Sequence, residues 1–120
     1  MIIAGVEENQ LYFEKMFGMK EIDHYSDAAY DEPIMGFEDG AHLASLGDGP
    51  FLALFQPLAE PPLAKSRYPV VAIYSSEFDA VVRRLTDLGL GYRDVPSSRP
   101  GLKIIVATDP AGNAIEIIRK

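Results

Sequence analysis

A repeated order of structural elements constrains the fold of this chain more than any other feature of its sequence. Residues 6–17 carry apolar side chains at helical spacing, and the pattern ends at Gly18. Residues 77–89 repeat that pattern in the second half of the chain, with Gly89 at the end. In both segments the glycine stands between two large apolar residues, and strand-like sequence follows. We therefore predict two copies of one unit, in which a strand, a helix and further strands follow one another.

Predicted strands complete both units. After an apolar opening at residues 2–4, the first half predicts strands at 19–26, 34–37, 41–47 and 50–57. The second half predicts strands at 68–75, 91–96, 102–109 and 113–120. Between the halves, Pro61 and Pro62 preclude a regular helix or an interior strand. We therefore expect two modules joined by a linker, at residues 1–58 and 67–120, with the linker at 59–66.

The two units also predict the fold class. A unit of this size cannot bury both faces of its own small sheet, so we expect the two copies to pack together. A helix covers one face of each sheet, and the opposite faces are left to curve toward each other. We expect an α+β fold in which two βαβββ modules, with curved mixed sheets, pack around a central cleft within one domain of 120 residues.

Charge and composition exclude several partners and chemistries. The formal net charge of -7 repels phosphate backbones and anionic membrane surfaces, so we expect no nucleic-acid partner and no membrane partner. The chain has no cysteine, which excludes disulfides, thiolate catalysis and cysteine-based zinc sites. No apolar stretch approaches the roughly 18 residues of a membrane span, and the first residues lack the pattern of a signal peptide. We expect a cytoplasmic protein.

Two motifs resemble those of the vicinal oxygen chelate superfamily, which includes glyoxalase I, extradiol dioxygenases and bleomycin resistance proteins. The segment LYFEKMFGM is similar to the first-helix pattern of that family, and DPAGNAIEI is similar to its final hairpin. The resemblance covers essentially the whole chain and implies the two-module fold. It also implies a homodimer, which would cover the short first strand with its exposed Ile2 and Ile3.

The resemblance also implies where a metal ion would be bound. In metal-dependent members, ligands come from the first, fourth and fifth strands, and a glutamate comes from the last strand. Glu116 matches that glutamate, but the fourth-strand position falls at about Ala53 and the fifth-strand position at about Val70. Neither side chain has a lone pair to donate, and the first-strand position falls before the start of the sequence. We therefore expect no metal ligands, no cofactor and no divalent metal.

Strand alternation predicts the side chains that line the cleft. If Glu116 points into it, the walls are apolar and aromatic with few polar groups, as in pockets for small molecules. The predicted ligand-binding residues are Glu116, Tyr74, Phe51, Phe55, Val70, Ala53 and His24. Two alternatives stay open: Phe51 and Phe55 fill the cleft as a closed core, or Glu116 pairs with a cationic side chain at the rim.

These expectations together predict a function. We expect a metal-independent small-molecule-binding protein of the glyoxalase and bleomycin-resistance type, with a cationic or aromatic ligand in the apolar cleft. The alternative is an enzyme, a lyase or dioxygenase of the glyoxalase type. It would use a displaced metal site at His24, His42 and Glu116, or Glu116 as general base. A non-catalytic interaction subunit is the third reading, and whether any reaction is catalysed stays open.

Overall fold

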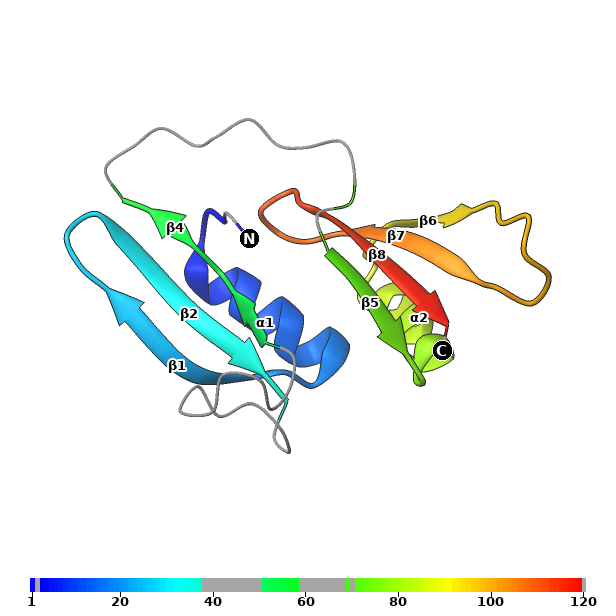
Figure 1. Ribbon diagram of the computed structural model, residues 1–120, viewed down its shortest axis with the longest axis horizontal. Coiled ribbons are helices and arrows are strands. Elements are labelled where there is room, and N and C mark those ends of the chain that lie inside the picture. The colour runs from blue at the N-terminus through cyan, green and yellow to red at the C-terminus, as the bar shows by residue number, and fades with distance from the viewer. Residues whose placement is uncertain (2, 38–50, 59–68, 70, 120) are drawn as a thin grey trace. The chain divides into compact units, whose positions relative to one another are not determined.

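The computed structural model describes residues 1, 3–37, 51–58, 69 and 71–119. The chain divides into two compact units, Met1–Ala64 and Lys65–Lys120, which are described separately below (Figure 1). The predicted strand at 41–47 and the predicted linker lie outside the described residues, as do three residues named above: Ile2, His42 and Val70.

Helix α1 of the first unit spans Val6–Phe17, which confirms the predicted helix at 6–17. Glu7 and Glu8 lie in its first turn, where negative side chains interact favourably with the helix dipole. The helix ends at Gly18, whose φ of 69° lies in the left-handed region that glycine adopts without strain. Four side chains of the helix are buried: Asn9, Tyr12, Phe13 and Met16.

The first sheet consists of β1 (Lys20–Ser26), β2 (Tyr30–Gly36), β3 (Phe51–Ala53) and β4 (Gln56–Pro57). Strand β2 lies between β1 on one side and β3 and β4 on the other, and all these pairs are antiparallel. The start of the chain joins the sheet edge, because Ile3 N–H donates to Phe55 O at 2.8 Å and Phe55 N–H donates to Met1 O at 2.6 Å.

Strand β2 is longer than the predicted strand at 34–37, because it already begins at Tyr30. The preceding turn explains the difference. Asp27 Oδ1 accepts hydrogen bonds from the N–H groups of Ala29 and Tyr30, at 2.6 and 3.2 Å, so the chain reverses at once and pairs with β1. The segment between the predicted strands at 19–26 and 34–37 therefore forms a tight hairpin and the first part of β2.

The second unit consists of β5 (Val71–Ser75), α2 (Phe78–Asp87), β6 (Tyr92–Val95), β7 (Ile104–Thr108) and β8 (Ala114–Arg119). The sheet order is β5-β8-β7-β6, with β5 parallel to β8 and the other pairs antiparallel. Each described element of this half falls within the range predicted for it. Immediately after β7 in the sequence, the side chain of Asp109 accepts a hydrogen bond from the backbone N–H of Asn113 at 2.7 Å and closes the final hairpin.

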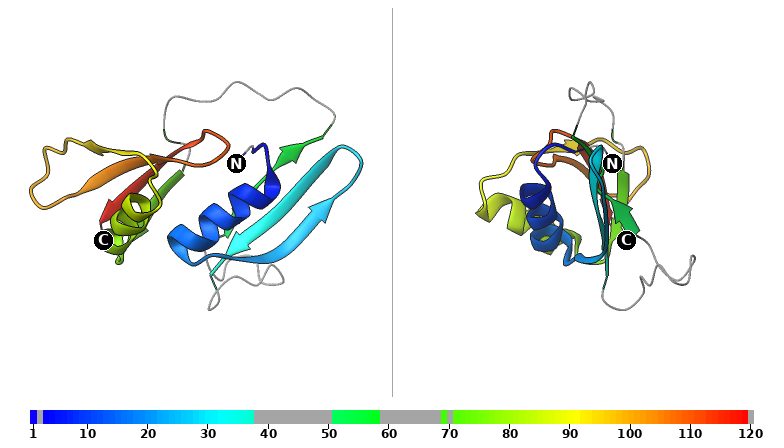
Figure 2. Two further views of the ribbon diagram at one scale, coloured as in Figure 1. Left: turned by 180° about the vertical axis from the view of Figure 1, so that it is seen from behind. Right: turned by 90° about the vertical axis from the view of Figure 1, so that its left-hand side faces the viewer.

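Both units therefore have the same construction. In each, the last strand lies beside the segment that opens the unit, and one helix lies against one face of its own sheet (Figure 2). Under α2, the buried side chains include Phe78, Val81 and Leu85 from the helix and Ile105, Ile115 and Ile117 from the sheet. These features confirm the α+β class and the two βαβββ modules. The described residues contain no helix long and apolar enough to cross a membrane.

Candidate functional site

Glu116 lies in β8 on the face of the second sheet that is turned away from α2. The orientation follows from Arg119, whose guanidinium donates a hydrogen bond to Asp79 of α2. Because side chains alternate along a strand, Ile117 and Ile115 share the face of Arg119. Both isoleucines are fully buried, and Glu116 between them is half-buried on the opposite face.

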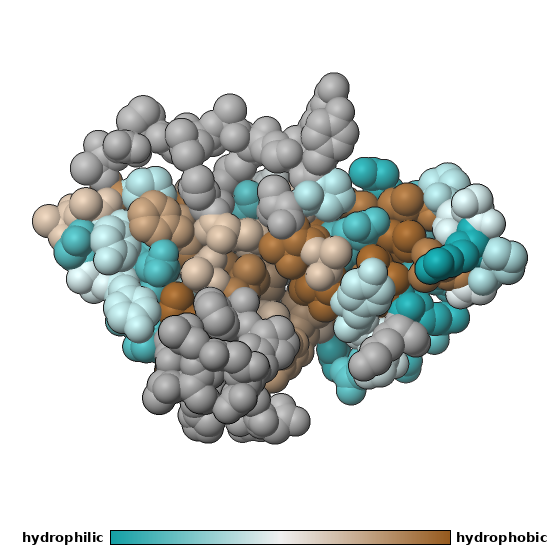
Figure 3. All heavy atoms as spheres, viewed as in Figure 1, coloured by the Kyte–Doolittle hydropathy of each residue, from teal (hydrophilic) through white to brown (hydrophobic). Residues whose placement is uncertain are grey.

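The strand register gives the neighbours of Glu116 on that face. Ala72 of β5 and Val106 of β7 are its direct partners on either side. Tyr74 lies one step further along β5 on the same face, and its side chain is 68% exposed. Among the described residues, none makes a hydrogen bond or an ion pair with the carboxylate of Glu116. In Figure 3, hydrophobic side chains gather over the strands of this unit. Glu116 and Tyr74 therefore supply polar groups on a largely apolar face.

Two of the predicted ligand-binding residues lie together in the first unit, on the face turned away from α1. Ala53 of β3 is paired with Ile34 of β2. The ring of Phe55 stacks on that of Tyr30, with 5.2 Å between the centroids and 23° between the planes. For Phe51 only the backbone is described, in a pair with Gly36. Phe55 is thus half-buried against an aromatic neighbour of its own module.

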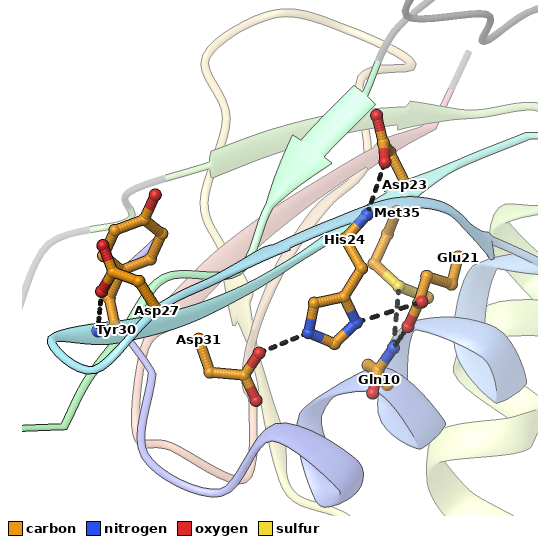
Figure 4. Close-up of polar contacts among 8 residues, drawn as sticks. All are labelled: Gln10, Glu21, Asp23, His24, Asp27, Tyr30, Asp31 and Met35. Atoms are coloured by element: carbon orange, nitrogen blue, oxygen red, sulfur yellow. Dashed lines mark hydrogen bonds and ion pairs between the residues drawn. The ribbon is translucent and has the colours of Figure 1, made fainter.

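His24 lies on the other face of the first sheet, the face that α1 covers (Figure 4). The reason is a β-bulge: the register between β1 and β2 shifts between Glu21 and Asp23. Glu21 faces α1, because its carboxylate accepts a hydrogen bond from Gln10 of the helix. Strict alternation from Glu21 would turn His24 away from α1, and the extra residue of the bulge brings it back to the same face.

Both ring nitrogens of His24 contact carboxylates. Nδ1 lies 3.2 Å from Glu21 Oε1, and Nε2 makes a hydrogen bond to Asp31 Oδ1 of β2. These hydrogen bonds raise the pKa of His24 above its ordinary value, with Asp31 as the largest cause, Glu21 adding to it and partial burial opposing it. Figure 4 shows the ring between the two acids, beside α1. The pair of acids therefore favours an imidazolium at this position.

A surface cavity of about 580 Å³ opens next to the ring. It lies within the first unit and is bounded by the start of α1, by β1 and β2 and by Gln56 of β4. The residues that line it are Gly5, Val6, Glu7, Glu8, Gln10, His24, Asp31 and Gln56. Six of these eight residues are polar or charged, in contrast to the apolar neighbours of Glu116. No sequence motif indicates this cavity, because the residues that line it come from separate elements.

The described part of the chain does not assemble the ligands of a metal ion. No group of three or more His, Asp or Glu side chains is arranged to hold one within residues 1, 3–37, 51–58, 69 and 71–119. Both nitrogens of His24 already contact carboxylates, and in the second unit no described acid or histidine stands beside Glu116. A divalent ion, which needs several O or N donors at once, does not fit these residues.

Comparisons with known proteins assign the family. The sequence profile described as Glyoxalase/Bleomycin resistance protein/Dioxygenase superfamily matches residues 3–117. The chain belongs to this superfamily. The match confirms the resemblance to the vicinal oxygen chelate proteins that the two sequence motifs indicated. Among curated protein sequences, none matches the chain.

Solved structures of the superfamily have the same fold. The chain is 14% identical to the fosfomycin resistance protein FosX from Listeria monocytogenes, in complex with Mn(II) and sulfate, over 100% of this chain and 87% of that chain, with a TM-score of 0.67. It is 16% identical to the trypanothione-dependent glyoxalase I of Leishmania major, over 99% of this chain and 81% of that chain, with a TM-score of 0.72. It is 12% identical to a glyoxalase/bleomycin resistance protein/dioxygenase domain from Frankia, over 98% of this chain and 91% of that chain, with a TM-score of 0.69. At these identities the likeness establishes the fold alone.

The prediction of no cofactor and no divalent metal is corrected by these structures. It was based on Ala53 and Val70, which occupy two expected ligand positions and have no donor atoms. FosX has the same fold over the whole chain and was solved with Mn(II), in one case together with 1S,2S-dihydroxypropylphosphonic acid. Divalent metal therefore occurs in this fold. Two apolar residues at expected positions do not exclude it, because donors at other positions can form a ligand set.

Proposed function

We propose that this member of the superfamily binds a small cationic or aromatic molecule at the face of the second sheet that carries Glu116. The supporting observation is that Glu116 is half-buried between Ala72 and Val106, with no hydrogen-bond donor among the described residues. A carboxylate in apolar surroundings is stabilised by a charged donor. A ligand with an ammonium or guanidinium group provides such a donor, and the net charge of -7 attracts cations.

Five of the six other predicted ligand-binding residues are part of this proposal. Tyr74 offers an exposed ring and hydroxyl on the face of Glu116. We keep Phe51, Ala53, Phe55 and Val70 as the sequence-based proposal for an apolar wall of the ligand site. His24 is left out of the ligand-binding set, because its ring nitrogens contact Glu21 and Asp31 on the face that α1 covers.

A second candidate function is an enzyme of the glyoxalase type, a lyase or a dioxygenase, in which Glu116 acts as general base. The same observation favours it. A carboxylate to which no described residue donates keeps its lone pairs available to accept a substrate proton. A reaction detected with wild-type protein and lost in Glu116→Gln, with ligand binding retained, would distinguish this candidate from binding alone.

The binding proposal is tested by isothermal titration calorimetry with a panel of aromatic amines and guanidines, each with and without Mn(II). Glu116→Gln is expected to weaken the tightest ligand by about 10- to 100-fold, the effect of losing a charge-assisted hydrogen bond. Glu14→Gln, at an exposed position of α1, is the matched control and should bind like the wild type. Equal affinity of the two variants, or no binding by the wild type, contradicts the proposal.

We also propose a homodimer in the cytoplasm. The sequence-based argument relied on an exposed Ile3, but Ile3 is buried within its own unit at 2% exposure. The support now comes from the second unit, where Leu88, Leu90 and Tyr92 are 51%, 37% and 38% exposed. Exposed large apolar side chains favour self-association. Size-exclusion chromatography with light scattering measures the assembly, and a monomer at micromolar concentration would count against it.

A further inference from the structure

The cluster around His24 connects three elements of the first unit. Asp31 of β2 bonds to Nε2 of the ring, and Glu21 of β1 lies at Nδ1. The second carboxylate oxygen of Glu21 accepts a hydrogen bond from Gln10 of α1. Gln10 in turn contacts the sulfur of the buried Met35 of β2 at 3.9 Å. Figure 4 shows this chain of contacts running from the hairpin to the helix.

The protonation state of His24 decides whether both of its contacts are attractive. A protonated imidazole donates from both nitrogens, so Glu21 and Asp31 each accept a hydrogen bond. A neutral imidazole donates from one nitrogen only. Its other nitrogen then presents a lone pair to a carboxylate, and that contact becomes repulsive. Loss of one proton therefore removes either the link from β1 to Asp31 of β2 or the contact that holds Glu21, the residue that Gln10 of α1 binds.

The charges around the ring all favour the protonated form. Among the described residues, the charged groups that face it are Glu21 on β1, Asp31 on β2, and Glu7 and Glu8 on α1, whereas the side chain of Asp23 lies on the other face of β1. Gln10 and Gln56 are the neutral polar groups of the adjoining cavity. The carboxylate of Asp23 accepts a hydrogen bond from the backbone N–H of His24 at 2.8 Å, which restrains the backbone of β1 at this position.

We propose that His24 is a proton-operated strap, which fastens the β1–β2 hairpin to itself and to α1 when the imidazole is charged and releases it when the imidazole is neutral. The β-bulge is the structural device that makes the strap, because it turns His24 and Glu21 to the same face of β1. The cavity beside the ring lies between the parts that the strap joins, so its walls are fixed in the charged state.

The sign of the pH dependence follows from the raised pKa of His24. The folded chain binds the proton more tightly than the unfolded chain, whose histidine has the ordinary pKa of about 6.5. The stabilisation is therefore complete below about pH 6.5 and is lost as the pH rises through the raised pKa of the folded protein. Because the ring is partly exposed, its effect is that of a surface ion pair.

The proposal is tested by amide hydrogen exchange of the full chain between about pH 5.5 and about pH 8.5, with rates corrected for intrinsic exchange. Protection of the β1–β2 amides in the wild type is expected to fall about two- to fivefold over this range, the effect of one surface ion pair. In His24→Gln the protection should be independent of pH. His42→Gln removes the chain's only other histidine and should behave like the wild type.

A second variant separates the strap from a general effect of charge. Asp31→Asn keeps the shape of the side chain but removes its charge, and NMR titration of the ring should show the pKa of His24 falling toward its ordinary value. Either of two results overturns the proposal. One is a wild-type ring that titrates at or below its ordinary pKa. The other is an unchanged pH dependence of hairpin protection in His24→Gln.

Discussion

The two glycines that follow the helices, Gly18 and Gly89, provide a quantitative test of the repeat. Gly18 and Gly89 have φ of 69° and 66°, and a Cβ built on either meets no atom within 4 Å. Alanine at these positions is therefore strained by its backbone conformation alone, with no clash to add. The left-handed conformation costs an L-residue about 1–2 kcal/mol. Alanine also lowers the conformational entropy of the unfolded chain, which stabilises the folded protein by about 0.4–1 kcal/mol.

The expected net loss is about 0.8 kcal/mol for Gly18→Ala and for Gly89→Ala, the difference between the midpoints of these two ranges. Urea unfolding of each variant measures this difference in the free energy of unfolding. Gly91→Ala is the matched control, because Gly91 has no positive φ and its Cβ would also meet no atom within 4 Å. That control should be neutral or up to about 1 kcal/mol more stable. Equal effects at Gly18 and Gly91 would refute the reasoning that the repeated glycine is required by its conformation.

Two further predictions concern the final hairpin and the pH dependence of stability. Asp109 is buried and accepts hydrogen bonds from the backbone N–H and side-chain amide of Asn113, at 2.7 and 2.9 Å. Asp109→Ala is therefore expected to lower the free energy of unfolding, measured in urea, by about 1–3 kcal/mol. A free energy of unfolding within error of the wild-type value would contradict this role. Between about pH 6 and about pH 9, the free energy of unfolding should fall further in the wild type than in His24→Gln, by up to about 1 kcal/mol. The reason is that the proton of His24 stabilises the folded form below its raised pKa. An identical pH profile for the two proteins would show that the contacts of His24 do not affect global stability.

Local sequence signals were sufficient for most of the fold. Helix α1 has the predicted bounds because its start and its end have separate local causes, the acids of the first turn and Gly18. The hairpin between β7 and β8 was also predictable, since Asp109 and Gly112 have the turn chemistry that the strands require. Such features depend on neighbours in sequence, and no tertiary contact overrides them in these segments.

The environment of His24 could not be predicted in the same way. Alternation assigns a strand residue to a face only if the register is regular, and the bulge after Glu21 changes the parity of every residue that follows it in β1. Nothing in the residues around Ile22 indicates a bulge. The hydrogen bond between Asp31 and His24 could not be predicted either, because it depends on where the hairpin turns, at Asp27. Long-range pairing determines both features.

The two modules show how one construction can carry different chemistry. In the second module, regular alternation along β8 leaves Glu116 on the face away from its helix, with no described hydrogen-bond donor. In the first module, the bulge in β1 places His24 and Glu21 on the helix side, where other side chains already satisfy them. An acid without a partner can take part in binding or proton transfer, whereas a satisfied cluster contributes to stability and responds to pH. The strand register of each module therefore decides which of its polar groups are available to a ligand, although the order of elements is the same in both.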